Sequence, residues 1–109
     1  MGYFYLFIAI IGEVVGTISL KSTNNFTEIL PSSYVVVGYG IAFYFMMLAM
    51  KTIPVAITYS IWAGLGISAI TILGALKYKE IPDTFALLGI CLIILGVIIL
   101  VFYSKMGAN

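Results

Sequence analysis

The sequence predicts an all-α membrane protein with four transmembrane helices. Two features of its composition point to this class: 63% of the 109 residues are hydrophobic, and only 8% are charged. A soluble chain of this size would need more polar side chains to cover its surface. The third observation is length. A helix needs about 20 apolar residues to cross a hydrocarbon core of about 30 Å, so the chain has room for four crossings and short links.

Charged residues and prolines gather in three short segments, at residues 21–33, 50–54 and 77–84. The apolar runs around them predict helices at about 3–20, 32–50, 55–76 and 84–104. Pro31, Pro54 and Pro82 fall at or just before the expected helix starts, where the missing N–H is harmless. The link between the second and third helices is so short that these helices must be antiparallel neighbours. We therefore expect a single domain, residues 1–109, built from helical hairpins.

The most informative residue is Glu13, an acid inside the first apolar run from Tyr3 to Leu20. An ionised acid at the centre of a membrane costs about 2.5–3.5 kcal/mol on insertion scales. A chain that carries one normally uses it for an ion, a proton or a substrate, although a buried Glu can also serve as a structural hydrogen-bond partner. We predict that Glu13 binds protons and substrate.

Helical spacing defines the face of the first helix on which Glu13 lies. The other members of this face are small or apolar residues and one threonine: Leu6, Ala9, Ile10, Gly16, Thr17 and Leu20. Gly12 and Gly16 form a GxxxG pair, a spacing that lets two membrane helices approach backbone to backbone. We expect this pair to hold Glu13 close to neighbouring helices that complete a site.

The second helix carries a stripe of large side chains, formed by Tyr39, Phe43, Met46 and Met50. Such stripes are common in ordinary packing. However, aromatic faces attract cations by about 0.5–2 kcal/mol each, and methionine adapts to varied shapes. The stripe therefore also suits the binding of diverse cations.

The third helix places Tyr59 and Trp62 on one face, followed by Gly64 and Gly66. Trp62 lies about two turns inside the expected helix start, which favours a site-lining role over a place in the interfacial aromatic belt. The two glycines allow either tight packing or a bend, because sharp kinks usually trace to Pro or Gly.

The fourth helix has no charged residue before Lys105, and its small residues Ala86, Gly89 and Gly96 lie on one stripe. Such a stripe suits association between chains, and it is also compatible with a surface that faces lipid.

The positive charges of the connecting segments are nearly balanced between the two sides of the membrane. One side holds Lys21, Lys77 and Lys79, and the other holds Lys51, Lys105 and the amino terminus. Because excess Lys and Arg on one side sets orientation, this near balance favours insertion in both orientations. Two oppositely oriented copies would create the inverted symmetry that larger transporters encode in one chain.

Three segments resemble the small multidrug resistance family of bacterial four-helix exporters: GEVVGTISLK at 12–21, PVAITYSIWAGLG at 54–66 and GICLIILGV at 89–97. Together they extend the resemblance over nearly the whole chain. Guanidinium exporters of the family tend to have Trp three places after the helix 1 acid, where this chain has Gly16 and then Thr17. With Tyr39 and Phe43 on the second helix, the chain is similar to the quaternary ammonium or multidrug arm. It departs from many relatives at Ala63, where they have a hydroxyl residue.

The resemblance implies a proton-coupled antiporter that works as an antiparallel homodimer, with Glu13 of both subunits in one site for protons and cationic drugs. The implied substrate pocket joins the Glu13 face to four aromatic residues, and its members are Leu6, Ala9, Ile10, Thr17, Tyr39, Phe43, Tyr59 and Trp62. Gly64 and Gly66 would form the hinge, and Gly89 with Gly96 would pack the dimer.

The expected partners are hydrophobic organic cations, protons, membrane lipids and a second copy of the chain, in the inner membrane of a bacterium. No phosphate-binding motif is present, and we expect no cofactor, no metal, no nucleic acid and no enzymatic activity. Three alternatives remain open: export of a small cation such as guanidinium or a polyamine, uptake of an osmolyte cation, and a non-transporting membrane subunit. The aromatic residues on two further helices argue against the non-transporting subunit.

Overall fold

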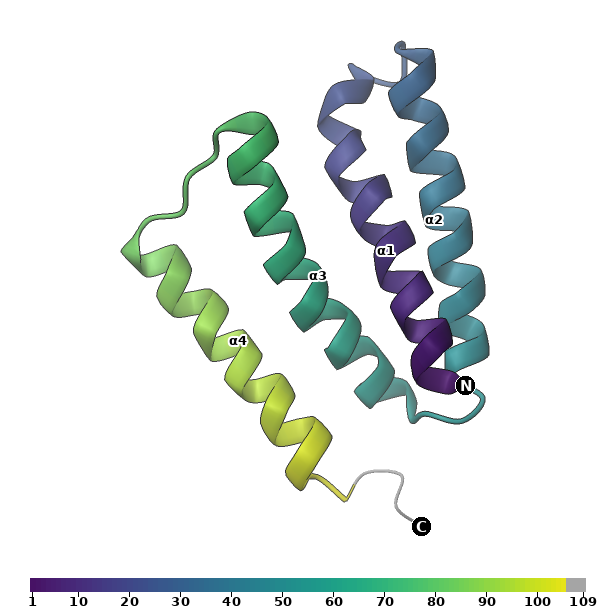
Figure 1. Cartoon of the computed structure of the whole chain (residues 1–109), viewed down its shortest axis with the longest axis vertical. Coiled ribbons are helices and arrows are strands. Elements are labelled where there is room, and N and C mark those ends of the chain that lie inside the picture. Colours follow the sequence, from purple (N-terminus) through teal and green to yellow (C-terminus); the bar gives the residue numbers. More distant parts are fainter. Residues whose placement is uncertain (106–109) are drawn as a thin grey trace. The chain divides into compact units, whose positions relative to one another are not determined.

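The computed structural model describes residues 1–105, and this part of the chain consists of four long helices with short links (Figure 1). The helices are α1 (Gly2–Leu20), α2 (Ile29–Ala49), α3 (Val55–Tyr78) and α4 (Thr84–Tyr103), with a 3-10 turn η1 (Lys21–Thr23) after α1. Each of the four is long and apolar enough to cross a membrane. The prediction of an all-α protein with four transmembrane helices is confirmed.

Two helix boundaries differ from the predicted ones. Helix α2 begins at Ile29 instead of residue 32, because Pro31 lies in its first turn, where an N–H has no partner within the helix. Helix α3 continues to Tyr78 instead of residue 76. Lys79 then adopts a left-handed conformation with φ 59°, and the N–H of Glu80 donates to the Gly74 carbonyl. The remaining helix ends lie at or next to the predicted residues.

The chain divides into two compact units, one from Met1 to Thr52 and the other from Ile53 onward. The first unit is the hairpin of α1 and α2, and the second contains α3 and α4. That all four helices form a single domain stays a prediction.

In the first unit, α1 and α2 lie side by side (Figure 1), and their backbones meet at glycines. A Cβ built on Gly12 would lie 2.7 Å from the carbonyl oxygen of Gly38, and one built on Gly38 would lie 2.6 Å from that of Gly12. Because helices in lipid gain little by hiding apolar surface, close packing of this kind is what holds them together. The close approach expected of the Gly12 and Gly16 pair is confirmed. Gly38, its partner on α2, was not singled out by the sequence.

A tight reversal joins α1 to α2. The hydroxyl of Thr23 donates to the Leu20 carbonyl at 2.8 Å, and the next three residues, 24–26, all have positive φ. The N–H groups of Thr27 and Glu28 then donate to the carbonyl of Thr23, each at 3.0 Å. These bonds satisfy the end of one helix while the chain turns into the next.

In the second unit, α3 and α4 contact each other at Gly64. A Cβ at this position would lie 2.9 Å from Cγ2 of Val97, so a larger residue would push the helices apart. Helix α4 contains no buried residue, and a Cβ at Gly89 or Gly96 would meet no atom within 4 Å. Within the second unit, α3 therefore covers only part of the apolar surface of α4.

The glycine contact of the first unit predicts a position-specific effect on stability. Gly38→Ala should destabilise the protein by about 1–3 kcal/mol, because the added methyl group meets backbone atoms of α1 that cannot move aside alone. Gly40→Ala is the matched control, since a Cβ there meets nothing within 4 Å and alanine favours helix. Denaturant titration in detergent, followed by circular dichroism, measures both, and equal stabilities would contradict the packing described.

Candidate functional site

Glu13 is half-buried on α1, and its two carboxylate oxygens have different surroundings. Oε1 accepts a hydrogen bond from the hydroxyl of Thr17, one turn further along the same helix, at 2.9 Å. Oε2 is buried and has no hydrogen-bond partner among the described residues. Since a buried acceptor without a donor is costly, the carboxylate is suited to receive a proton or a cation at Oε2.

Thr17 also connects Glu13 to the second helix, because its hydroxyl lies 2.6 Å from that of Tyr39 on α2. A threonine hydroxyl has one hydrogen, so when Thr17 donates to Glu13 it must accept from Tyr39. We call this series of bonds, from Tyr39 through Thr17 to Glu13, the hydrogen-bond chain. Tyr39 donates to Thr17 and Thr17 donates to Glu13, so the chain fixes the position of Oε1.

The glycine contact makes the hydrogen-bond chain possible. A Cβ on Gly16 would lie 3.3 Å from the ring of Tyr39, so the tyrosine lies directly against the α1 backbone. The same ring stacks on Phe43, with centroids 6.0 Å apart and planes 23° from parallel. The side chain of Phe43 is 56% exposed, which leaves an aromatic surface open next to the chain.

The structure therefore brings together four of the predicted site residues: Glu13, Thr17, Tyr39 and Phe43. Leu6, Ala9 and Ile10, on the predicted Glu13 face, are buried. Their role as walls of a substrate pocket stays a prediction.

Tyr59 and Trp62 lie in the second unit, where their rings form an edge-to-face pair with centroids 5.4 Å apart. Helix α3 runs without interruption through Gly64 and Gly66, which are both buried. The assignments of the ring pair to the pocket and of the glycines to a hinge stay predictions.

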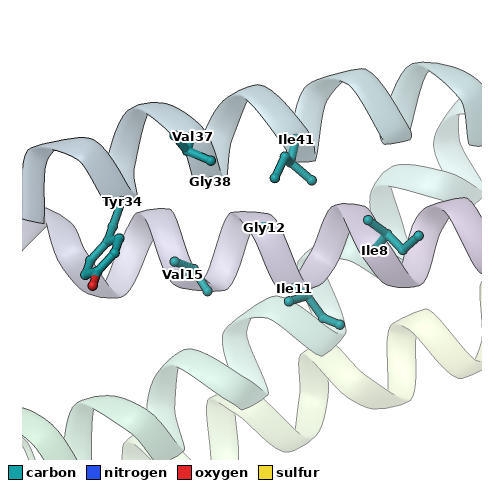
Figure 2. Close-up of a pocket in the computed structure, with 8 residues that line it drawn as sticks. All are labelled: Ile8, Ile11, Gly12, Val15, Tyr34, Val37, Gly38 and Ile41. Carbon is teal, nitrogen blue, oxygen red and sulfur yellow. The ribbon is translucent and has the colours of Figure 1, made fainter.

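A second feature of the first unit is an apolar groove between α1 and α2 (Figure 2). Helical spacing places its α1 residues on the other face of that helix from Glu13. It encloses about 250 Å³ and is lined by Ile8, Ile11, Gly12, Val15, Tyr34, Val37, Gly38 and Ile41. We call it the α1–α2 groove. Gly12 and Gly38 form its floor, and branched side chains stand at its sides (Figure 2). Sequence reasoning missed this groove because its residues read as ordinary apolar filler.

Comparison with known proteins gives the family. The family model for the Small Multidrug Resistance protein matches residues 1–93. The chain belongs to the small multidrug resistance family. Among its relatives, quaternary ammonium compound-resistance protein QacE of Escherichia coli is 44% identical over 99% of this chain and 98% of its own length. Multidrug transporter PA4990 of Pseudomonas aeruginosa is 46% identical over 98% of this chain and 97% of its own.

A third relative, quaternary ammonium compound-resistance protein QacG of a Staphylococcus species, is 41% identical over 96% of this chain and 98% of its own length. The resemblance to this small multidrug resistance family and to its quaternary ammonium or multidrug arm is thus confirmed. Members of the family are transporters, so the chain is a multi-pass membrane transporter and not an enzyme. The alternative of a non-transporting membrane subunit is set aside on the same evidence.

The hydrogen-bond chain predicts that Thr17 and Tyr39 are energetically coupled. In a double-mutant cycle, Thr17→Val and Tyr39→Phe should be non-additive in unfolding free energy by about 0.5–3 kcal/mol, because either change alone breaks the same bond between α1 and α2. Denaturant titration of the two single variants and the double variant gives this coupling. Tyr44→Phe, which removes the same hydroxyl from an exposed ring elsewhere on α2, should be additive with Thr17→Val. Additivity in both pairs would show that the bond is absent.

Proposed function

We propose that this transporter exports hydrophobic and quaternary ammonium cations in exchange for protons, with both competing for Glu13. The observation that carries the proposal is the carboxylate itself, in a helix that can cross the membrane. Oε1 is held by Thr17, and Oε2 is buried with no donor among the described residues. The names of the relatives, two quaternary ammonium compound-resistance proteins and a multidrug transporter, support the substrate class.

Competition follows from charge. An ionised carboxylate away from water needs a positive partner, and either a proton or an organic cation provides one. When a proton binds Glu13, the carboxyl becomes neutral and the cation loses its partner. If the site opens to one side of the membrane at a time, proton entry on the acidic side releases the cation there. A proton gradient then drives export.

The hydrogen-bond chain serves this exchange by orientation. Thr17, itself held by Tyr39, donates to Oε1, so a cation or a proton meets Oε2 in one geometry. The exposed ring of Phe43 lies one step away, stacked on Tyr39, and offers its face to the apolar part of the substrate. Charge attraction and ring contacts need no fixed pattern of hydrogen bonds, so specificity is broad.

The edge-to-face pair of Tyr59 and Trp62 supplies further aromatic surface to the proposed pocket, and Leu6, Ala9 and Ile10 supply apolar wall. Bending of α3 near Gly64 and Gly66 would switch the side to which the site opens.

We also propose that the transporter works as an antiparallel homodimer in the bacterial inner membrane. Helix α4 supports this assembly, since its apolar surface has no buried residue and its positions Gly89 and Gly96 are open to a close neighbour. The near balance of lysines between the two sides supports insertion in both orientations.

Transport by sealed vesicles tests the proposal. With the interior more acidic than the medium, purified native protein should accumulate a lipophilic quaternary ammonium dye inside, because protons leave as the dye enters. Glu13→Gln should reduce this movement to the rate of protein-free vesicles, since an amide has no charge to exchange.

Glu80→Gln is the matched control, because Glu80 is exposed beyond the end of α3 and should keep the native rate. Dye movement by Glu13→Gln at the native rate would contradict the proposal. Gradient-driven movement of guanidinium without movement of the dye would instead support the small-cation exporter.

The affinity for a lipophilic cation should fall as pH falls. The sign follows from competition: lower pH raises the fraction of Glu13 that is neutral, and a neutral carboxyl does not attract a cation. Where most of the protein carries the competing proton, the apparent affinity falls about tenfold per pH unit for each proton displaced. Equilibrium binding of radiolabelled tetraphenylphosphonium between pH 5 and 9 measures the slope, and an affinity that does not change with pH would exclude a shared carboxylate.

A further inference from the structure

We propose that Ser68 allows α3 to bend within the membrane, and that the bend forms at Gly64 and not at Gly66. This inference rests on the proposed function, in which bending of α3 changes the side to which the site opens. It gives a positioning role to a residue outside the proposed pocket.

Ser68 bonds to its own helix one turn back. Its hydroxyl donates to the Gly64 carbonyl at 2.9 Å, and the bond is partly buried. In an α-helix the same carbonyl also accepts the N–H of residue 68. The Gly64 carbonyl therefore has two donors, both from Ser68, where an ordinary helical carbonyl has one. Hydroxyl bonds of this kind often bend helices, and Gly/Ser pairs are among the few places where sharp kinks form.

The second donor matters because α3 is a helix that can cross the membrane. A bend breaks bonds between N–H and carbonyl groups, and a carbonyl freed in the hydrocarbon core finds no water to replace them. At Gly64 the hydroxyl of Ser68 keeps the carbonyl bonded when the N–H leaves. One turn after Gly66 the residue is Ile70, whose side chain has no donor. A bend therefore costs less at Gly64 than at Gly66.

The packing of α3 against α4 leaves room for movement beside this carbonyl. The two helices touch at Gly64, where a Cβ would lie 2.9 Å from Cγ2 of Val97. Next to this contact is a hollow of about 160 Å³, lined by Gly64, Leu65, Ser68, Ile94, Val97 and Ile98. Because closely packed helices resist tilting, the hollow gives the part of α3 beyond Gly64 space to tilt about the contact.

Two other hydroxyls of α3 make the same kind of bond. Ser60 donates to the Ala56 carbonyl at 2.7 Å, and Thr71 donates to the Ile67 carbonyl at 2.7 Å. Neither accepting residue is a glycine, so each has a Cβ that restricts its backbone. Thr71, three residues after Ser68 on the same helix, is therefore a matched control.

The rate of transport tests the role of Ser68. In the vesicle assay, Ser68→Ala should lower the rate at saturating dye about fivefold, the worth of one neutral hydrogen bond on which the bent form depends. The affinity for tetraphenylphosphonium should stay native, because the straight helix keeps its backbone bond. Ser68→Thr should restore the rate, since threonine carries the hydroxyl and the hollow has room for its methyl group. Thr71→Ala should keep the native rate.

A native rate in Ser68→Ala, or a loss that Ser68→Thr or Thr71→Ala shares, would overturn the proposal.

Amide hydrogen exchange of the full chain in bilayers, followed by NMR, tests the bend without a gradient or a dye. Bending frees the N–H of residue 68, so in Ser68→Ala, where the bend is rarer, exchange at this amide should slow about fivefold after correction for intrinsic rates. A merely structural bond predicts the opposite sign, because its loss loosens the helix and speeds exchange. Ser68→Thr and Thr71→Ala should keep the native exchange rate at residue 68.

Exchange at residue 68 that is as fast as native or faster in Ser68→Ala would overturn the proposal. Slower exchange in Ser68→Ala, together with no gradient-driven transport by the native chain, would support the bend and refute the proposed export.

Discussion

The close approach of α1 and α2 at Gly12 and Gly38 is the contact on which both sides of the first hairpin depend. With Cβ positions that would lie within 2.7 Å of opposing carbonyl oxygens, the two backbones are as close as sterics allow. On one side, this distance lets Tyr39 lie against Gly16 and reach the hydroxyl of Thr17. On the other side, the absence of side chains at the contact leaves the α1–α2 groove. The same glycine contact therefore shapes two surfaces, a polar one around Glu13 and an apolar one at the groove.

The two surfaces differ in the polar groups that they carry. Around Glu13, the hydrogen-bond chain ends in a single donor, the Thr17 hydroxyl, to one carboxylate oxygen, and the second oxygen has no donor among the described residues. An incomplete site of this kind is unfavourable for a structural acid and useful for one that exchanges partners. The groove has no such demand, because apart from Tyr34 it is lined by aliphatic side chains and glycines.

Much of the architecture could be read from the residues. Composition and the spacing of prolines predicted four apolar helices. Glu13, the one acid of the first helix, and the motif around it indicated the family. The predicted start of α2 is wrong, because Pro31 lies inside the first turn of the helix, which does not use that N–H. The bond between Thr17 and Tyr39 was also missed, since a residue list does not say which members of two helical faces meet.

The sequence by itself determined the class, the family and the identity of the acid within the first membrane helix, because each follows from local features: apolar length, the cost of a charge in lipid, and short motifs. Only the tertiary structure decided which glycine of α2 meets Gly12, which oxygen of Glu13 is held, and where a groove remains. These depend on the register of one helix against another. Register is set by contacts between residues far apart in the chain, and periodicity within a single helix carries no record of it.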